Sequence, residues 1–223
     1  MTWSPAGDFE TVCDGLTTVT LRRHNGTELT TENALRRMVT TREAAASGGK
    51  YTAGDVRWHL DQIDSVAYIG YGSLSAPRVG ERIVDSGNTI WTILAVEEAT
   101  LGSRFGCVCR NMAVYHGLNE KVNIERSTQT KGVHGEPLLT WEARAYDVLA
   151  KVHVSGDSQT DERSARTHRR TATVYFAEDV DLDPQRDRIV QPDGTVWMVE
   201  SYSMPESIDQ LPRATVTDDQ WPL

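Results

Sequence analysis

Cysteine is scarce in this sequence, and its three cysteines, Cys13, Cys107 and Cys109, are an odd number. An odd set does not form the paired framework of a small secreted domain, and the first residues lack the apolar core of a signal peptide. No uninterrupted apolar run approaches the roughly 20 residues that span a bilayer. We therefore expect a protein made in a reducing cytoplasm, with no membrane partner.

Positive charge is also in short supply. The 23 lysines and arginines are outnumbered by 32 aspartates and glutamates, for a formal net charge of −9, and most of the excess lies after Asn111. Tight nucleic-acid binding depends on neutralising phosphates, so a chain this acidic is a poor candidate for it. An acidic surface that repels DNA still suits a place where DNA must slide past.

The signatures of common catalytic sites are missing as well. The sequence has no Gly-x-Ser-x-Gly elbow, no His-Glu-x-x-His and no phosphate-binding loop, and its six histidines are scattered singly. A catalytic base needs partners within reach. We therefore expect no enzymatic activity, no catalytic residues and no cofactor.

What the sequence does contain is a repeated hairpin. Asp187–Val199 reads as two strands around the turn dipeptide Asp193-Gly194, because glycine tolerates the positive φ of a tight turn. Glu81–Ile93 is its near twin: Arg-Ile-Val, Thr and Trp recur at one constant offset, the 106 positions that separate Trp91 from Trp197. This spacing is close to half of the chain and indicates a duplicated module.

The duplication predicts a mainly β fold. Many short strand-like segments at regular spacing favour two similar small β-barrel or β-sandwich modules in tandem. We divide the chain into an N-terminal arm (1–16), a first β module (17–117) and a second β module (118–223).

Some local assignments within this plan remain open. Apolar residues at helical spacing between Thr30 and Ala46 predict one short helix in the first module, with an irregular excursion as the alternative. Gly106–Tyr115 is predicted to be the last strand of the first module. Four tryptophans in strand-like contexts are expected to be core anchors: Trp58, Trp91, Trp141 and Trp197.

Two groups of residues in the sequence could supply metal ligands. Alternation places the thiols of Cys107 and Cys109 on one face of a strand, but zinc needs four ligands, and no second pair stands at usable spacing. Ordinary packing therefore explains them. Asp179, Asp181 and Asp183 resemble the start of a calcium loop without its glycine and its final glutamate, so a solvated acidic loop is preferred over a weak cation site. We predict no metal site.

The segment Ser155–Arg166 is polar and charged, and it reads as a protruding loop. A basic cluster follows it, which either is solvated and paired with nearby acids or contacts an acidic partner or DNA. The candidate channel or partner loop comprises Asp157, Asp161, Glu162, Arg163, Arg166, Arg169 and Arg170.

The order of segments in the second half resembles the head-tail joining proteins of tailed bacteriophages, also called head-closure or stopper proteins. The matching segments are Val122–Arg126, Gly135–Trp141, Tyr146–Val152, Arg169–Val174 and Asp187–Val199. The first half keeps the Arg-ending strand Val19–Arg23 and the hairpin Glu81–Ile93, but it lacks the Gly-Glu-x-x-x-x-Trp segment.

This resemblance implies a structural protein of the head-tail connector (neck), located in the virion and assembled in the cytoplasm of a bacterial host. Such proteins form a homo-oligomeric ring, contact a portal or adaptor protein and a tail protein, and let DNA pass without sequence-specific binding. The alternative is a β-barrel binding module that recognises a protein or carbohydrate, which the tryptophan and tyrosine content permits.

Overall fold

The structure, a computed structural model, describes residues 15–61, 76–98, 104–131, 137–162 and 165–218. Cys13 and nearly all of the predicted N-terminal arm (1–16) lie outside these ranges. The chain divides into two compact units, Met1–Met112 and Ala113–Leu223. Within the described ranges, no helix is long and apolar enough to cross a membrane.

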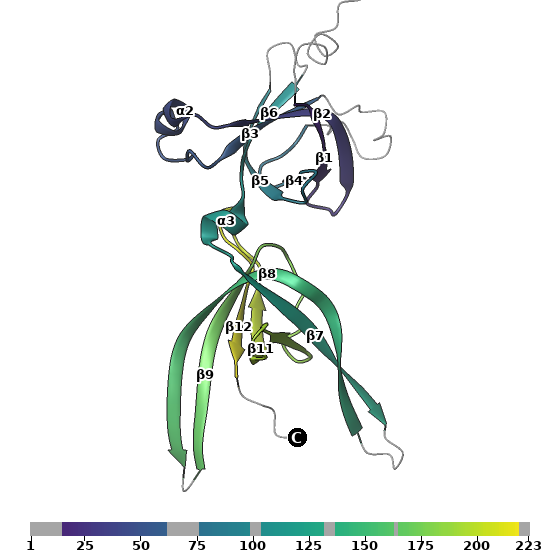
Figure 1. Cartoon of the computed structure of the whole chain (residues 1–223), viewed down its shortest axis with the longest axis vertical. Coiled ribbons are helices and arrows are strands. Elements are labelled where there is room, and N and C mark those ends of the chain that lie inside the picture. Colours follow the sequence, from purple (N-terminus) through teal and green to yellow (C-terminus); the bar gives the residue numbers. More distant parts are fainter. Residues whose placement is uncertain (1–14, 62–75, 99–103, 132–136, 163–164, 219–223) are drawn as a thin grey trace, which may run out of the picture. The chain divides into compact units, whose positions relative to one another are not determined.

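The first unit is a closed, antiparallel, six-stranded barrel (Figure 1). A short helix, α2 (Thr41–Ala46), lies between its second and third strands. The strands follow one another around the barrel in the order β1-β2-β3-β6-β5-β4. Their bounds are β1 (Thr17–Arg22), β2 (Glu28–Met38), β3 (Val56–Asp61), β4 (Arg82–Val84), β5 (Ile90–Glu98) and β6 (Arg104–Arg110).

The second unit is a closed barrel with the same strand order, β7-β8-β9-β12-β11-β10. Helix α3 (Met112–His116) precedes it in the sequence. Its strands are β7 (Glu120–Lys131), β8 (Pro137–Glu162), β9 (Ala165–Phe176), β10 (Asp187–Val190), β11 (Val196–Ser203) and β12 (Arg213–Thr217). The predicted mainly β fold of two tandem modules is confirmed, and both modules are barrels.

The repeated hairpins are β4–β5 and β10–β11, and they share one strand register. Ile83 lies opposite Trp91 in the first, and Ile189 lies opposite Trp197 in the second. Each indole Nε1 donates a hydrogen bond to the side chain six positions earlier: to Asp85 Oδ2 at 2.9 Å from Trp91, and to Gln191 Oε1 at 2.7 Å from Trp197.

The second strand of each hairpin also has a register shift at the same position. The register shifts between Ile93 and Ala95 in the first barrel, and between Val199 and Ser201 in the second. All of these positions differ by 106, so the offset in the sequence corresponds to equivalent places in space. A bulge bends a strand locally, which helps it follow the curve of a small barrel.

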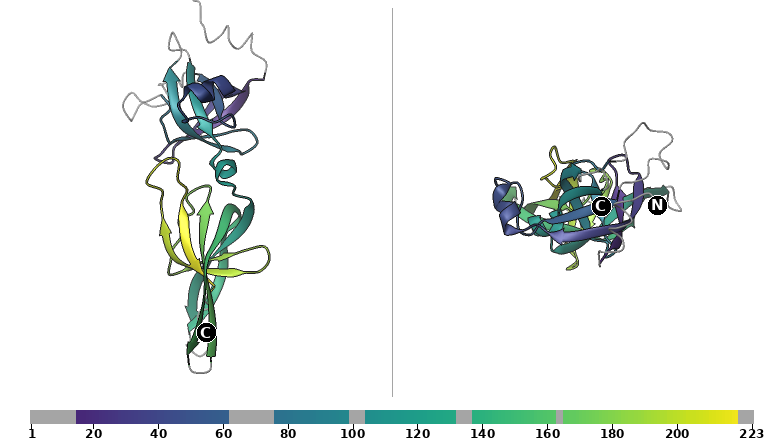
Figure 2. Two further views of the ribbon diagram at one scale, coloured as in Figure 1. Left: turned by 90° about the vertical axis from the view of Figure 1, so that its left-hand side faces the viewer. Right: turned by 90° about the horizontal axis from the view of Figure 1, so that it is seen from above.

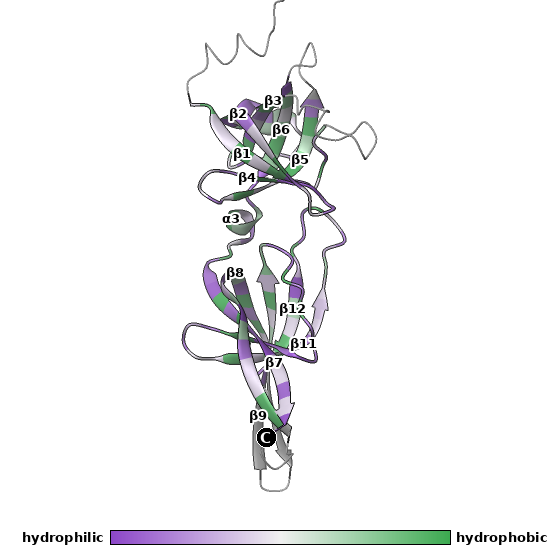
Figure 3. Ribbon diagram, turned by 90° about the vertical axis from the view of Figure 1, so that its right-hand side faces the viewer, coloured by the Kyte–Doolittle hydropathy of each residue, from purple (hydrophilic) through white to green (hydrophobic). Residues whose placement is uncertain are grey.

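Each barrel buries its own apolar core. The tryptophans Trp58, Trp91 and Trp197 are buried within these two cores. Trp141 differs from the expected core anchor, because it is only partly buried and its ring lies 4.2 Å from the Arg188 guanidinium carbon. Figure 3 shows hydrophobic segments recurring along the strands of both barrels, as alternation between core and solvent requires.

The helix predicted between Thr30 and Ala46 is wrong for its first part. Residues up to Met38 belong to β2, and only Thr41–Ala46 is helical, with Thr40 and Glu43 forming a reciprocal capping box. The helical spacing of Ala34 and Met38 does not mark one buried face, since Ala34 is buried and Met38 is exposed. A bulge also interrupts the strand alternation: Asn33 adopts a φ of +56° where the β1–β2 register shifts. The extra residue places the buried Thr31 and Ala34 three positions apart instead of two.

The predicted last strand of the first module, Gly106–Tyr115, is also too long. β6 ends at Arg110, and Met112–His116 forms α3, which is followed by Gly117 at a φ of +67°. Arg110 donates two hydrogen bonds of 2.8 Å to the buried carboxylate of Asp55, at the start of β3. This pair fixes the end of the strand at the rim of the barrel.

Each barrel also contains an ion pair with a buried carboxylate at the same topological position. Arg23, just after β1, donates from Nη1 to Glu81 Oε2 at 2.9 Å, before β4. Arg126 in β7 donates to both oxygens of Asp187 at 2.6 and 2.7 Å, at the start of β10. The first strand of each barrel is thereby joined to the repeated hairpin.

We expect Asp187→Asn to destabilise the second unit by about 2 kcal/mol, because it removes the buried charge that Arg126 and Arg144 face and replaces one acceptor oxygen by a donor. The measurement is the free energy of unfolding from hydrogen exchange of the β7 and β10 amides. Asp181→Asn is the matched control: Asp181 is exposed, so its pair with Arg144 should contribute no more than about 0.5 kcal/mol. Equal effects of the two substitutions would contradict this prediction.

Acid should weaken the second unit through the same carboxylate. Burial acts to raise the pKa of Asp187, but the hydrogen bonds from Arg126 and from the backbone of Asp183 outweigh it and lower the pKa below its ordinary value. This stabilisation is complete above the unfolded pKa of about 4 and is lost as the pH falls through the folded value. Urea titrations at pH 7 and pH 3 should show a smaller acid effect in Asp187→Asn than in the wild type.

Candidate functional site

The segment Ser155–Arg166, predicted to be a loop, is part of a long hairpin. β8 and β9 stay paired from Ala150 opposite Phe176 out to Glu162 opposite Ala165. The residues beyond Thr171, the last residue of β9 that pairs with β12, are called the β8–β9 arm: 156–162 with 165–170. The polar composition suggested a loop, because a strand that lies outside a core lacks the alternation of apolar and polar residues by which strands are predicted.

A second hairpin arm extends from the same barrel. β7 and β8 continue to pair from Ser127 opposite Trp141 to Lys131 opposite Pro137, beyond the Arg126 ion pair. We call residues 127–131 with 137–141 the β7–β8 arm. β8 arches across the barrel, and both arms leave on the same side of it (Figures 1 and 2).

The bend in β8 has a local cause. Tyr146 and Asp147 together face Asn123, because the β7–β8 register shifts between Val122 and Ile124. Asp147 adopts a φ of +52°, and its amide donates to Asn123 Oδ1 at 3.2 Å. Aspartate tolerates this left-handed conformation better than most residues, so a bulge turns the strand where the barrel must close.

The first barrel lacks the β8–β9 arm. The last register pair of β2 and β3 is Met38 with Val56, and the equivalent pair in the second barrel is Val154 with Ala172. The connections that follow, 39–55 and 155–171, have the same length. In the first unit this connection contains α2, whereas in the second it continues the ladder.

The predicted site residues therefore lie along a hairpin. Asp157 is opposite Arg170, Asp161 is opposite Arg166, and Ser158 is opposite Arg169 in the backbone register. Glu162 ends β8, and Arg163 lies outside the described residues.

The base of the β8–β9 arm is held by contacts of Arg170 with Asp218 and Trp197. Arg170 donates to both carboxylate oxygens of Asp218, from its backbone N at 2.6 Å and from Nε at 2.7 Å. Burial acts to raise the pKa of Asp218, but these hydrogen bonds outweigh it and lower the pKa. The Arg170 guanidinium also lies 5.4 Å from the Trp197 ring centroid, within cation–π range.

The acidic loop before β10 is held by specific contacts. Tyr202 Oη donates to Asp179 Oδ1 at 2.8 Å, and Arg144 Nη2 lies 2.6 Å from Asp181 Oδ2. Asp183 Oδ1 accepts the backbone N–H of Gln185 at 3.0 Å. These carboxylates are drawn to separate partners. Among the described residues, no group of three or more His, Cys, Asp or Glu could hold a metal ion.

Cys107 and Cys109 are free and fully buried in the first barrel. Cys107 lies between Trp58 and Val96 in the strand ladder. In the second barrel the position equivalent to Cys107 is Ala214, and that equivalent to Cys109 is Val216. Because ordinary apolar residues fill the same positions there, the thiols fill space in the core.

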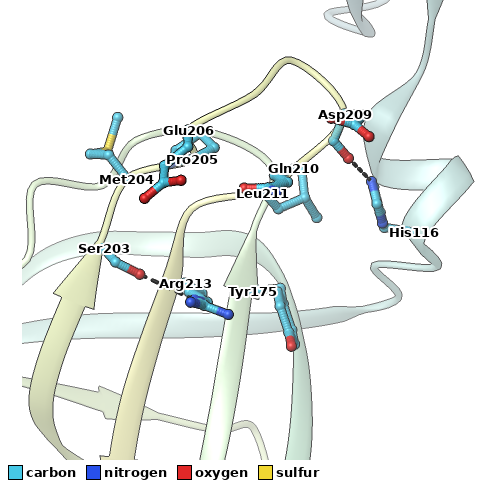
Figure 4. Close-up of a pocket in the computed structure, with 10 residues that line it drawn as sticks. All are labelled: His116, Tyr175, Ser203, Met204, Pro205, Glu206, Asp209, Gln210, Leu211 and Arg213. Carbon is cyan, nitrogen blue, oxygen red and sulfur yellow. Dashed lines mark hydrogen bonds between the residues drawn. The ribbon is translucent and has the colours of Figure 1, made fainter.

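A pocket of about 390 Å³ in the second unit was not foreseen (Figure 4). It lies where β9 and β11 end and β12 begins. His116 Nε2 lies 2.9 Å from the backbone oxygen of Asp209, and Arg213 Nε donates to Ser203 Oγ at 3.2 Å. Tyr175, Met204 and Leu211 contribute to its lining. Closure of the barrel brings these distant residues together, so no local pattern could predict the pocket.

We expect both buried thiols to resist labelling in the native protein. Burial raises the pKa of Cys107 to about 12 and raises that of Cys109 well above its ordinary value, so neither forms a thiolate at pH 8. Peptide mapping after alkylation should find both residues modified only in denaturant. Cys107→Ala and Cys109→Val should each cost less than about 1.5 kcal/mol. Rapid native labelling would contradict this account.

Comparison with protein-family models gives no match, and comparison with curated proteins gives none either. Among solved structures, the chain is similar to one in the virion of the native gene transfer agent (GTA) particle, with a TM-score of 0.35 and 14% identity, over 45% of this chain and 94% of that one. It is also similar to protein SF1141 from Shigella flexneri 2a, with a TM-score of 0.30 and 20% identity, over 43% and 90% of the two chains. At these scores, neither similarity bears on function.

Proposed function

We propose that this chain is a structural virion protein of the head-tail connector of a tailed-phage-like particle, where it closes the DNA-filled head and joins it to the tail. The observation that supports this role is the order of segments in the second unit. An Arg-ending strand, a long bent strand, a Thr-rich strand and a closing hairpin follow as in the head-tail joining proteins. In this chain they are consecutive elements of one closed barrel.

The proposed role is mechanical, with no chemical step. The charged side chains that would attract attention in an enzyme are engaged in structural pairs, such as Arg126 with Asp187 and Arg170 with Asp218. In the pocket, His116 contacts a backbone carbonyl. A general base instead needs an orienting partner and a substrate proton within reach.

The proposed partners are further copies of this chain in a ring, a portal or adaptor protein on one side and a tail protein on the other. DNA would pass through the ring without sequence-specific contacts. The net charge of −9 supports this part of the proposal, since an acidic surface repels the phosphates of a passing duplex.

The role is tested with particles made by a host that carries the gene intact or disrupted. Mass spectrometry of purified particles should find the chain in several copies, and electron microscopy of the disrupted strain should show tailless heads that lose DNA. Complementation with the intact gene should restore tailed, filled particles.

Two outcomes would overturn the proposal: normal tailed particles from the disrupted strain, or purified particles that lack the chain. A protein that stays monomeric, is absent from particles and binds an isolated protein or glycan would instead support the binding-module alternative.

A further inference from the structure

The β8–β9 arm has two strand edges that pair with no further strand in the described part of the chain. β7 pairs with β8 only as far as Ala150, and β12 pairs with β9 only from Thr171 to Tyr175. Between Gly156 and Glu162, β8 pairs with β9 alone. A two-stranded ribbon is marginal by itself, and each open edge offers unpaired N–H and C=O groups to another strand.

The sequence gives these two edges opposite charge. The β8 side of the arm carries Asp157, Asp161 and Glu162 and no basic residue. The β9 side carries Arg166 and Arg169, with Arg170 at its base, and no acidic residue. Each arm therefore has an acidic edge and a basic edge.

The base of the arm is closely packed. The register shifts between Val154 and Gly156, and a Cβ at Gly156 would lie 2.9 Å from Thr171 Oγ1. A side chain there would displace the side chain of Thr171, and glycine avoids this close contact where the strands leave the barrel. On the opposite strand, Asp218 holds Arg170.

We infer that the β8–β9 arm is a contact between copies of this chain, in which the acidic β8 edge of one copy adds to the basic β9 edge of the next. The inference rests on the proposed function for the presence of several copies. In arms that point the same way, β8 runs outward and β9 runs back, so neighbouring edges meet antiparallel. Main-chain hydrogen bonds then extend the sheet from copy to copy.

The charge pattern also selects the symmetry of this contact. A two-fold dimer would bring the same edge from both copies together, placing acid beside acid or base beside base. Opposite charges on neighbouring strands stabilise a sheet, and like charges destabilise it. The arm therefore favours a head-to-tail contact, which closes into a ring when the rotation between copies permits.

The test uses two charge-reversed full-length variants. The first, Asp157→Lys/Asp161→Lys/Glu162→Lys, makes both edges of the arm basic. The second, Arg166→Glu/Arg169→Glu, makes both edges acidic. We expect each variant alone to self-associate about tenfold or more weakly than the wild type, because every contact between copies is then repulsive. An equal mixture should assemble again with the two variants alternating.

The mixture separates contact between copies from damage to the arm itself. Repulsion within an arm is the same in the mixture as in each variant alone, so only contact between different copies can restore assembly. Glu32→Lys and Arg42→Glu reverse exposed charges in the first unit and serve as controls that should assemble like the wild type. Sedimentation equilibrium at low salt measures the masses, and hydrogen exchange should show the arm amides protected only in the assembled state.

Three results would overturn the inference: no association of the wild type or of the mixture at millimolar concentration, assembly of either variant alone, or failure of the mixture. The proposed function has its own test in purified particles. If the variants enter particles as the wild type does, the arm contact is excluded while the neck role stands.

Discussion

An arginine pairs with a buried carboxylate at the same place in each barrel, where the first strand lies beside the start of the repeated hairpin. Glu81 binds Arg23 and also accepts the backbone N–H of Arg78, while Asp187 binds Arg126 and accepts that of Asp183. Each carboxylate thus joins the first strand of its barrel to the loop before the repeated hairpin. A buried charge is tolerated only when it is paired and hydrogen-bonded, so losing one partner would expose the full desolvation cost of the other.

Much of this architecture could be predicted from the sequence, because the relevant signals are local. The repeated Ile-Val, turn and Trp pattern predicted both hairpins, and Ile83 and Ile189 face Trp91 and Trp197 at equivalent places. The Arg-ending strands were also visible as patterns, whereas their buried acidic partners were not. Pairing across about 60 residues leaves no periodic trace.

The predictions failed for strands whose apolar residues do not alternate between core and solvent, or that lie outside a core. Strand β2 has apolar residues at helical spacing, Ala34 and Met38, although only Ala34 is buried. The outer half of β8 lies beyond the barrel, so no apolar alternation marks Gly156–Glu162 as a strand. The pocket beside Tyr175 depends on barrel closure, which brings the β11–β12 connection beside α3.

The two barrels differ in how far their strands extend beyond the residues that close the barrel. In the second unit closure is complete at the Arg126–Asp187 pair and at Thr171 opposite Thr217, and both arms begin just beyond these points. The strands lengthen there outside the core, because none of the arm residues belongs to the buried apolar cluster of the second barrel. The two barrels therefore share one strand order and one hairpin, and the second differs by the two arms that extend its strands.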